Sequence, residues 1–171
     1  MELLQRLRSE HADILQALEH FEEELQAFEE AGNADIDAMR ENLEWMTHQP
    51  LQQHVHEEQA LCRALASHEG EARRTAEAMQ DSTENLTETA EALLEQIEDM
   101  AEDVVVPRDR FDALARRFVA ECLDQIEREE NELFPLAERL LTDAEWQRLE
   151  RGNGYHAPPL HAQSAALWEI R

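Results

Sequence analysis

Residues 4–28 read LQRLRSEHADILQALEHFEEELQAF, and they carry the clearest pattern of secondary structure in the chain. Its apolar side chains recur every three or four positions, which is the spacing of one face of an α-helix. The face consists of Leu4, Leu7, His11, Ile14, Leu18, Phe21, Leu25 and Phe28. The stretch therefore predicts a long amphipathic helix, and Gly32 is placed as its C-cap glycine.

The same spacing returns in three further blocks of the chain. The second block has an apolar face over residues 36–65 that Pro50 interrupts, and a proline there predicts a bend just before His54. The third block covers residues 76–100, and the fourth begins at Pro107 and extends to Leu140. Four long amphipathic helices joined by short turns predict an all-α fold, an antiparallel up-down-up-down four-helix bundle.

A short helix is expected after the fourth block. Thr142-Asp-Ala-Glu145 has the pattern of a capping box, so it predicts a C-terminal capping helix that carries Trp146. We assign residues 1–151 to the bundle and residues 152–171 to a C-terminal tail. The tail contains Pro158-Pro159 and several apolar residues, and it either packs back on the bundle or contacts a partner.

The composition excludes several classes of partner. The 171 residues include 15 Lys+Arg and 40 Asp+Glu, which gives a formal net charge of −25. A nucleic-acid or anionic-membrane partner needs a basic face, so neither is expected. The first residues have no apolar signal core, and no stretch approaches the roughly 20 apolar residues of a membrane span. Cys62 and Cys122 have no metal or redox spacing, so a reduced, cytoplasmic protein is predicted.

Polar side chains interrupt the apolar faces in all four blocks. They are His11, His54, Glu58, Thr83, Gln125 and Glu129. Counting residues from each predicted turn, at a rise of about 1.5 Å per residue, places all of them at one depth in the bundle. Random placement would scatter them along its length.

The spacing of these residues also favours a particular chemistry. His54 with Glu58, and Gln125 with Glu129, are four residues apart, so each pair can reach one point from a helix face. Buried imidazoles and carboxylates are costly unless they are paired, protonated or bound to a cation. The combination suits iron, manganese or zinc. A metal-free network of hydrogen bonds between histidines and carboxylates is the alternative interpretation.

Three segments resemble the hemerythrin-like proteins of the HHE cation-binding family, over roughly residues 1–150. The first is Glu10-His11, followed by Ile14 and Leu18. The second is Trp45-Met-Thr-His-Gln-Pro50, followed by the pattern His54-x-x-x-Glu58. The third comprises Val106-Pro107-Arg108, Arg128-Glu-Glu-Asn-Glu-Leu-Phe-Pro-Leu-Ala-Glu138 and Trp146. Their order, spacing and proline positions are similar to those of the family.

The resemblance implies a non-haem di-iron centre held by histidines and bridging carboxylates in the bundle core. It implies binding of O₂, sensing of oxygen or redox state, iron storage or the handling of nitric oxide. His11, His54, Glu58 and Glu129 match ligand positions of the family. Thr83 and Gln125 stand where the family has histidines. The resemblance therefore implies a reduced site that holds at most one iron or other divalent cation.

Three hypotheses for function follow. The first is a metal-binding protein that holds its cation through His11, His54, Glu58 and Glu129. The second is a bundle without metal that acts as a structural or regulatory protein, with a protein partner or a second copy of the chain. The third is an enzyme, a non-haem iron oxidase or a protein that handles nitric oxide or peroxide. We rank it last because half of the family's ligand set is missing.

Neighbouring polar residues are assigned to other roles. His56, Glu57 and Glu130 are one or two positions away from the predicted ligands, so they are expected at the surface. Thr83 and Gln125 are expected as hydrogen-bonding core partners. His48 is the best candidate for a substitute ligand, because it precedes His54 on the far side of Pro50.

Overall fold

Every regular element in the described part of the chain is a helix. The computed structural model describes residues 2–31, 35–48 and 50–152. In chain order the elements are α1 (Glu2–Ala31), α2 (Ile36–His48), α3 (Pro50–Ala66), α4 (Glu71–Ala101), α5 (Arg108–Arg128), the π-helical segment η1 (Glu129–Leu133), α6 (Phe134–Leu140) and α7 (Asp143–Gly152). Gly32 and residues 153–171 of the predicted tail lie outside the described residues.

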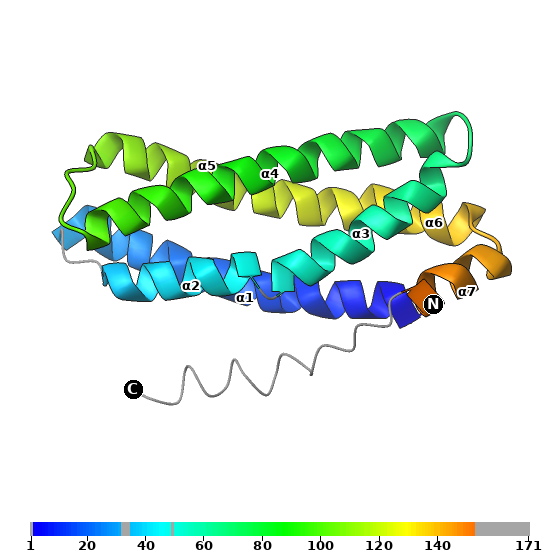
Figure 1. Ribbon diagram of the computed structural model, residues 1–171, viewed down its shortest axis with the longest axis horizontal. Helices are drawn as coiled ribbons and strands as arrows, with labels where there is room; N and C mark the ends of the chain where they lie inside the picture. Colours follow the sequence, from blue (N-terminus) through cyan, green and yellow to red (C-terminus); the bar gives the residue numbers. More distant parts are fainter. Residues whose placement is uncertain (1, 32–34, 49, 153–171) are drawn as a thin grey trace.

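These elements form four antiparallel rods, as the sequence predicts. The rods are α1, α2 with α3, α4, and α5 with η1 and α6, and the chain passes from one end to the other along each in turn (Figure 1). Helix α1 packs against α2, α3 and α5, while α4 packs against α2, α3 and α5. The up-down-up-down four-helix bundle is therefore confirmed. No helix in the described ranges is long and apolar enough to cross a bilayer.

The predicted capping helix is also present as α7, which contacts α1 and α3 at the end of the bundle that holds the N-terminus (Figure 1). Its start has the reciprocal bonds of a capping box. The Thr142 backbone N–H donates to Glu145 Oε2 at 2.8 Å, and the Glu145 N–H donates to Thr142 Oγ1 at 3.4 Å.

A polar layer divides the apolar interior into two halves. One half contains Phe21, Met39, Leu93 and Phe118, and the other contains Leu7, Leu61, Met79 and Phe134. The buried polar residues between them on the four rods are Glu10, His11, His54, Glu57, Glu58, Thr83, Gln125 and Glu129. The predicted layer at a single depth is therefore present in the structure.

The second rod consists of two helices that meet near Pro50. We predicted one helix with a bend just before His54; α2 ends at His48, α3 begins at Pro50 and runs at an angle to α2 (Figure 1), and Gln49 lies outside the described residues. A proline is well accommodated in the first turn of a helix, because its missing N–H has no partner there in any case. The place of Pro50 at the start of α3 agrees with this preference.

The fourth rod contains a wide turn that the periodicity does not reveal. In η1 the Phe134 N–H donates to the carbonyl of Glu129, five residues earlier. The next residue is Pro135, which has no N–H to offer and whose ring would clash with the carbonyl four residues back. An added residue in the turn before the proline relieves that clash, and such π-turns are frequent at functional sites.

The packing of α5 gives a direct test of this core. Phe118 is fully buried and makes an edge-to-face contact with Phe21, with ring centroids 6.1 Å apart. We expect Phe118→Ala to lower the free energy of unfolding by about 3 to 5 kcal/mol, because it leaves a cavity. Leu123→Ala on the same helix is the control, since Leu123 is 43% exposed and should change stability by less than about 0.5 kcal/mol. Chemical denaturation measures both, and equal effects would contradict this packing.

Candidate metal centre

Three side chains from three elements meet in the middle of the polar layer. His11 comes from α1, His54 from α3 and Glu129 from the first position of η1. His11 Nε2 lies 3.1 Å and His54 Nε2 lies 3.0 Å from the same oxygen, Glu129 Oε2. One ligand atom from each of the three residues lies within 4.8 Å of the others, and all three residues are buried. Three of the four predicted ligands are thus brought together.

The other ring nitrogen of each histidine also has a carboxylate partner. His11 Nδ1 lies 2.8 Å from Glu130 Oε1, and His54 Nδ1 lies 3.1 Å from Glu10 Oε2. We call Glu10 and Glu130 the outer carboxylates. An ionised carboxylate can only accept hydrogen bonds, so each Nδ1 carries the proton that is donated.

Glu58, the fourth predicted ligand, is buried in the same layer but lies outside this group of three. Thr83 Oγ1 lies 3.0 Å from Glu58 Oε1, and the Gln125 side-chain amide donates to the same oxygen at 3.1 Å. Gln125 Nε2 is also 3.1 Å from Thr83 Oγ1. Thr83 and Gln125 are therefore hydrogen-bonding partners in the core, as the sequence predicts.

A small cavity connects the two parts of the layer. It has a volume of about 20 Å³, and its polar lining comes from His54, Glu58, Thr83, Gln125 and Glu129. Gln125 Oε1 and Glu129 Oε1 are buried without a hydrogen-bond partner among the described residues. This space is enough for about one water molecule or ion, and both unpaired oxygens could accept a hydrogen bond or bind a cation.

Burial and charge shift the pKa of three groups in the layer. Burial lowers the pKa of His54, but the charge of Glu129 and the hydrogen bonds to Glu10 and Glu129 outweigh it and raise that pKa to about 10. Burial raises the pKa of Glu129, yet the charge of His54 and the hydrogen bonds from both histidines lower it to about 2. Burial and the charge of Glu129 raise the pKa of Glu58 to about 8.

The donor set fits a divalent cation. Two ligand atoms that each lie about 2.1 Å from one metal ion are separated by about 3 to 4 Å, and the two Nε2 to Oε2 distances are 3.0 and 3.1 Å. Glu129 Oε1, which is buried and unpaired, offers a further oxygen. A cation at this point would replace protons in balancing the buried carboxylate.

Sequence reasoning missed the outer carboxylates and one buried ion pair. Glu130, which we predicted at the surface, is one-third exposed and contacts His11 Nδ1, while Glu129 contacts Nε2 of the same ring. Glu57, which we also predicted at the surface, is buried. Arg6 Nε donates a hydrogen bond to Glu57 Oε2 at 2.9 Å.

A signal for Glu10 was present in the sequence. Leu3, Glu10 and Ala17 are seven residues apart and all buried, so the apolar face of α1 is wider than predicted. His56 is exposed as predicted, and the side chain of His48 lies outside the described part of the chain.

The pKa shifts predict how stability depends on pH in the metal-free protein. The folded-state pKa values of His54 and Glu58 lie above their ordinary values of 6.5 and 4.5, so the folded protein keeps protons that the unfolded chain releases. Their stabilising contribution is complete below the ordinary pKa and is lost as the pH rises through the raised one. We therefore expect the free energy of unfolding to fall between pH 4.5 and 10.

Glu129 acts in the opposite sense, since its contribution is present above pH 4.5 and is lost as the pH falls to about 2. In Glu58→Gln the free energy of unfolding should decrease less steeply between pH 4.5 and 8, by up to about 1.4 kcal/mol per pH unit. Urea denaturation at a series of pH values measures this slope. Glu138→Gln is the control, because it replaces the same kind of side chain at an exposed position of α6. Identical slopes in the two variants would contradict the raised pKa of Glu58.

Comparison with known protein families agrees with this geometry. The model of the family described as hemerythrin HHE cation binding domain matches residues 2–137, which contain the whole polar layer. Comparisons with curated proteins and with solved structures give no match. Because the family match covers most of the chain, this protein belongs to the hemerythrin HHE cation-binding domain family.

Proposed function

We propose that this protein binds one divalent metal ion through His11, His54 and Glu129. The observation that carries the proposal is the convergence of two imidazole Nε2 atoms on one oxygen of Glu129, in the centre of the bundle. Glu58 is the fourth predicted ligand, and its place beside the cavity next to His54 and Glu129 makes it available to the same ion or to a ligand of that ion.

Iron is the metal that we favour. Two histidines and one carboxylate, with positions left open, are the donor set of mononuclear non-haem Fe(II) proteins. Iron bound by this set could exchange electrons and take up a small ligand at its open positions. The residues around it would exclude bulk water, because His11 and His54 are each 3% exposed and Glu129 is 0% exposed. Such a site suits the sensing of oxygen, redox state or nitric oxide, or the handling of iron.

The residues beside the centre favour one ion rather than two. The positions where the family resemblance places further histidines hold Thr83 and Gln125, and both donate hydrogen bonds to Glu58. A threonine hydroxyl and an amide are neutral, weak ligands compared with imidazole. The Glu58 side of the layer is therefore satisfied by hydrogen bonds without a second ion.

The competing function is a bundle without metal that acts through protein contacts, with another protein or a second copy of the chain. One observation favours it, because both ring nitrogens of His11 and of His54 already have carboxylate partners. Protons alone could therefore satisfy the layer.

Metal analysis distinguishes the two functions. We expect the protein purified after expression with added iron to hold about one iron per chain, and the metal-free protein to bind Co²⁺ with a rise in melting temperature. His54→Ala and Glu129→Gln should each weaken Co²⁺ binding by at least about 100-fold, since each removes a ligand. Calorimetric titration of the metal-free variants measures the affinity.

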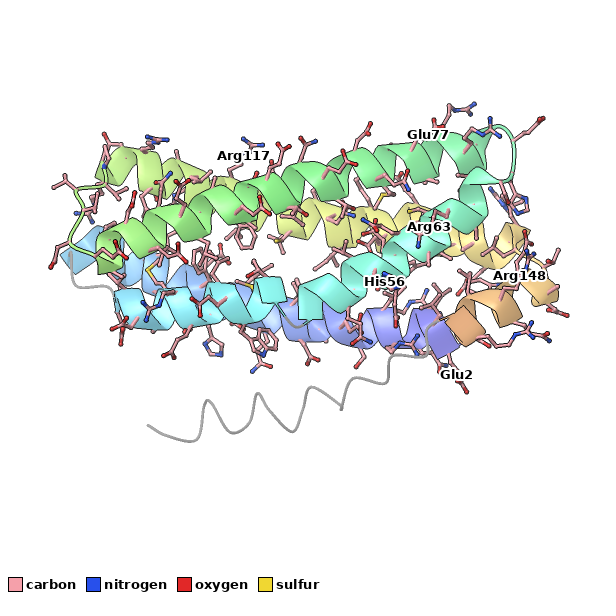
Figure 2. The ribbon with its side chains drawn as sticks, in the orientation of Figure 1. Glu2, His56, Arg63, Glu77, Arg117 and Arg148 are labelled. Atoms are coloured by element: carbon pink, nitrogen blue, oxygen red, sulfur yellow. The ribbon has the colours of Figure 1, made fainter. Side chains whose placement is uncertain are left out.

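His56→Ala is the matched control, because His56 lies on α3 two positions from His54 and is exposed (Figure 2). This variant should bind Co²⁺ as the natural chain does. A chain that holds less than about 0.1 metal per molecule and shows no change of melting temperature with Fe²⁺ or Co²⁺ would favour the metal-free function instead.

Restoring histidines should change the number of ions. The double variant Thr83→His and Gln125→His places imidazoles beside Glu58, and we expect it to bind two ions per chain where the natural chain binds one. Metal content and the absorbance band of an oxo-bridged di-iron centre report this gain. The same band in the natural chain would contradict a single-ion site.

A further inference from the structure

We infer that the outer carboxylates, Glu10 and Glu130, are positioning residues that hold the two imidazoles with both Nε2 atoms directed at Glu129. This inference rests on the proposed function, since the orientation matters most if Nε2 is a metal ligand. It assigns a role to two residues that no ligand pattern in the sequence identifies. The argument depends on the contacts of each ring in turn.

His54 is held between two carboxylates from different rods. Its Nδ1–H donates to Glu10 Oε2 of α1 at 3.1 Å, while its Nε2 lies 3.0 Å from Glu129 Oε2 of η1. Glu10 and His54 are both buried, so water does not compete for this hydrogen bond. A ring turned by 180° would exchange nitrogen for carbon at these positions and lose both contacts.

His11 is held in the same way, but its outer partner reaches the surface. Its Nδ1–H donates to Glu130 Oε1 at 2.8 Å, and Arg8 Nε donates to the other oxygen of Glu130 at 3.0 Å. The ring also stacks on Phe134, with centroids 5.5 Å apart and planes 6° from parallel. Arg8 lies 5.4 Å from the centroid of the same Phe134 ring. Arg8 therefore supports both contacts that orient His11.

The two arrangements share one physical consequence. Because an ionised carboxylate accepts and does not donate, each outer carboxylate keeps a proton on Nδ1. In the metal-free protein Nε2 donates to Glu129, and a metal ion that displaced this proton would bind at Nε2. A carboxylate on the far side of a ligating histidine also raises the basicity of the ring, and its loss typically costs 10- to 100-fold in metal affinity. The structure supplies one such carboxylate to each imidazole.

The test compares Glu10→Gln and Glu130→Gln with the control Glu138→Gln. Glu138 Oε1 lies 3.6 Å from the guanidinium of Arg8 but is bonded to neither imidazole, so its variant removes a nearby charge without changing a ring contact. We expect Co²⁺ affinity to fall about 10- to 100-fold in the first two variants and less than about twofold in the control. Glu130 is one-third exposed, so Glu130→Gln provides a test even if Glu10→Gln does not fold.

Nuclear magnetic resonance of the metal-free protein measures the chemical shifts of the histidine Nδ1 protons, which a general loss of stability would not change. The Nδ1 protons of His11 and His54 should give slowly exchanging downfield signals. Glu10→Gln should shift the His54 signal upfield and leave that of His11 in place, while Glu130→Gln should do the reverse. Both signals should be unchanged in Glu138→Gln.

The outcomes separate the inference from the proposed function. Failure of the natural chain to bind Co²⁺ would refute the metal site, while the resonance experiment would still decide whether the outer carboxylates orient the rings. If the natural chain binds Co²⁺ and both glutamine variants bind it equally well, the positioning role is wrong. Nδ1 signals that do not respond to either substitution would also overturn it.

Discussion

The sharing of one oxygen of Glu129 by two imidazoles is the interaction on which the polar layer depends. It joins α1, α3 and η1, three elements that are far apart in the sequence. The Nε2 atoms of His11 and His54 lie 3.1 and 3.0 Å from Glu129 Oε2. All three side chains are buried, so removing one partner would leave an uncompensated charge, a defect that typically costs about 3 to 5 kcal/mol. The rods can therefore slide past one another only by breaking this contact, and the interaction fixes their relative heights.

The layer has two chemically different sides. Around Glu129 the contacts are between imidazoles and carboxylates, whereas around Glu58 they are hydrogen bonds from Thr83 and Gln125. A buried charged cluster contributes little net stability compared with well-packed apolar residues, so stability alone does not explain it. The proposed cation on the charged side would account for the cost. The other side needs no ion, since neutral groups already donate to Glu58.

A backbone irregularity begins at the shared carboxylate. Pro135 lies six residues after Glu129, and the turn before it is π-helical, with the Phe134 N–H bonded to the carbonyl of Glu129. Glu129 and Glu130 both contact His11, one at each ring nitrogen. Glu129 itself has α-helical backbone angles, φ −61° and ψ −48°, so these two contacts do not require the wide turn.

The four rods could be predicted from the sequence, because helical periodicity is a local property that survives in the folded chain. The depth at which His11, His54 and Glu129 meet could also be predicted, since the rise of a helix converts residue counts into heights. The pairing of each buried acid with a particular ring could not be predicted and became visible in the folded arrangement of the rods. This arrangement places Glu58 with Thr83 and Gln125 and brings the outer carboxylates to the histidines. Those pairings depend on the rotation of each helix about its axis, which is set by packing between rods that are distant in the chain.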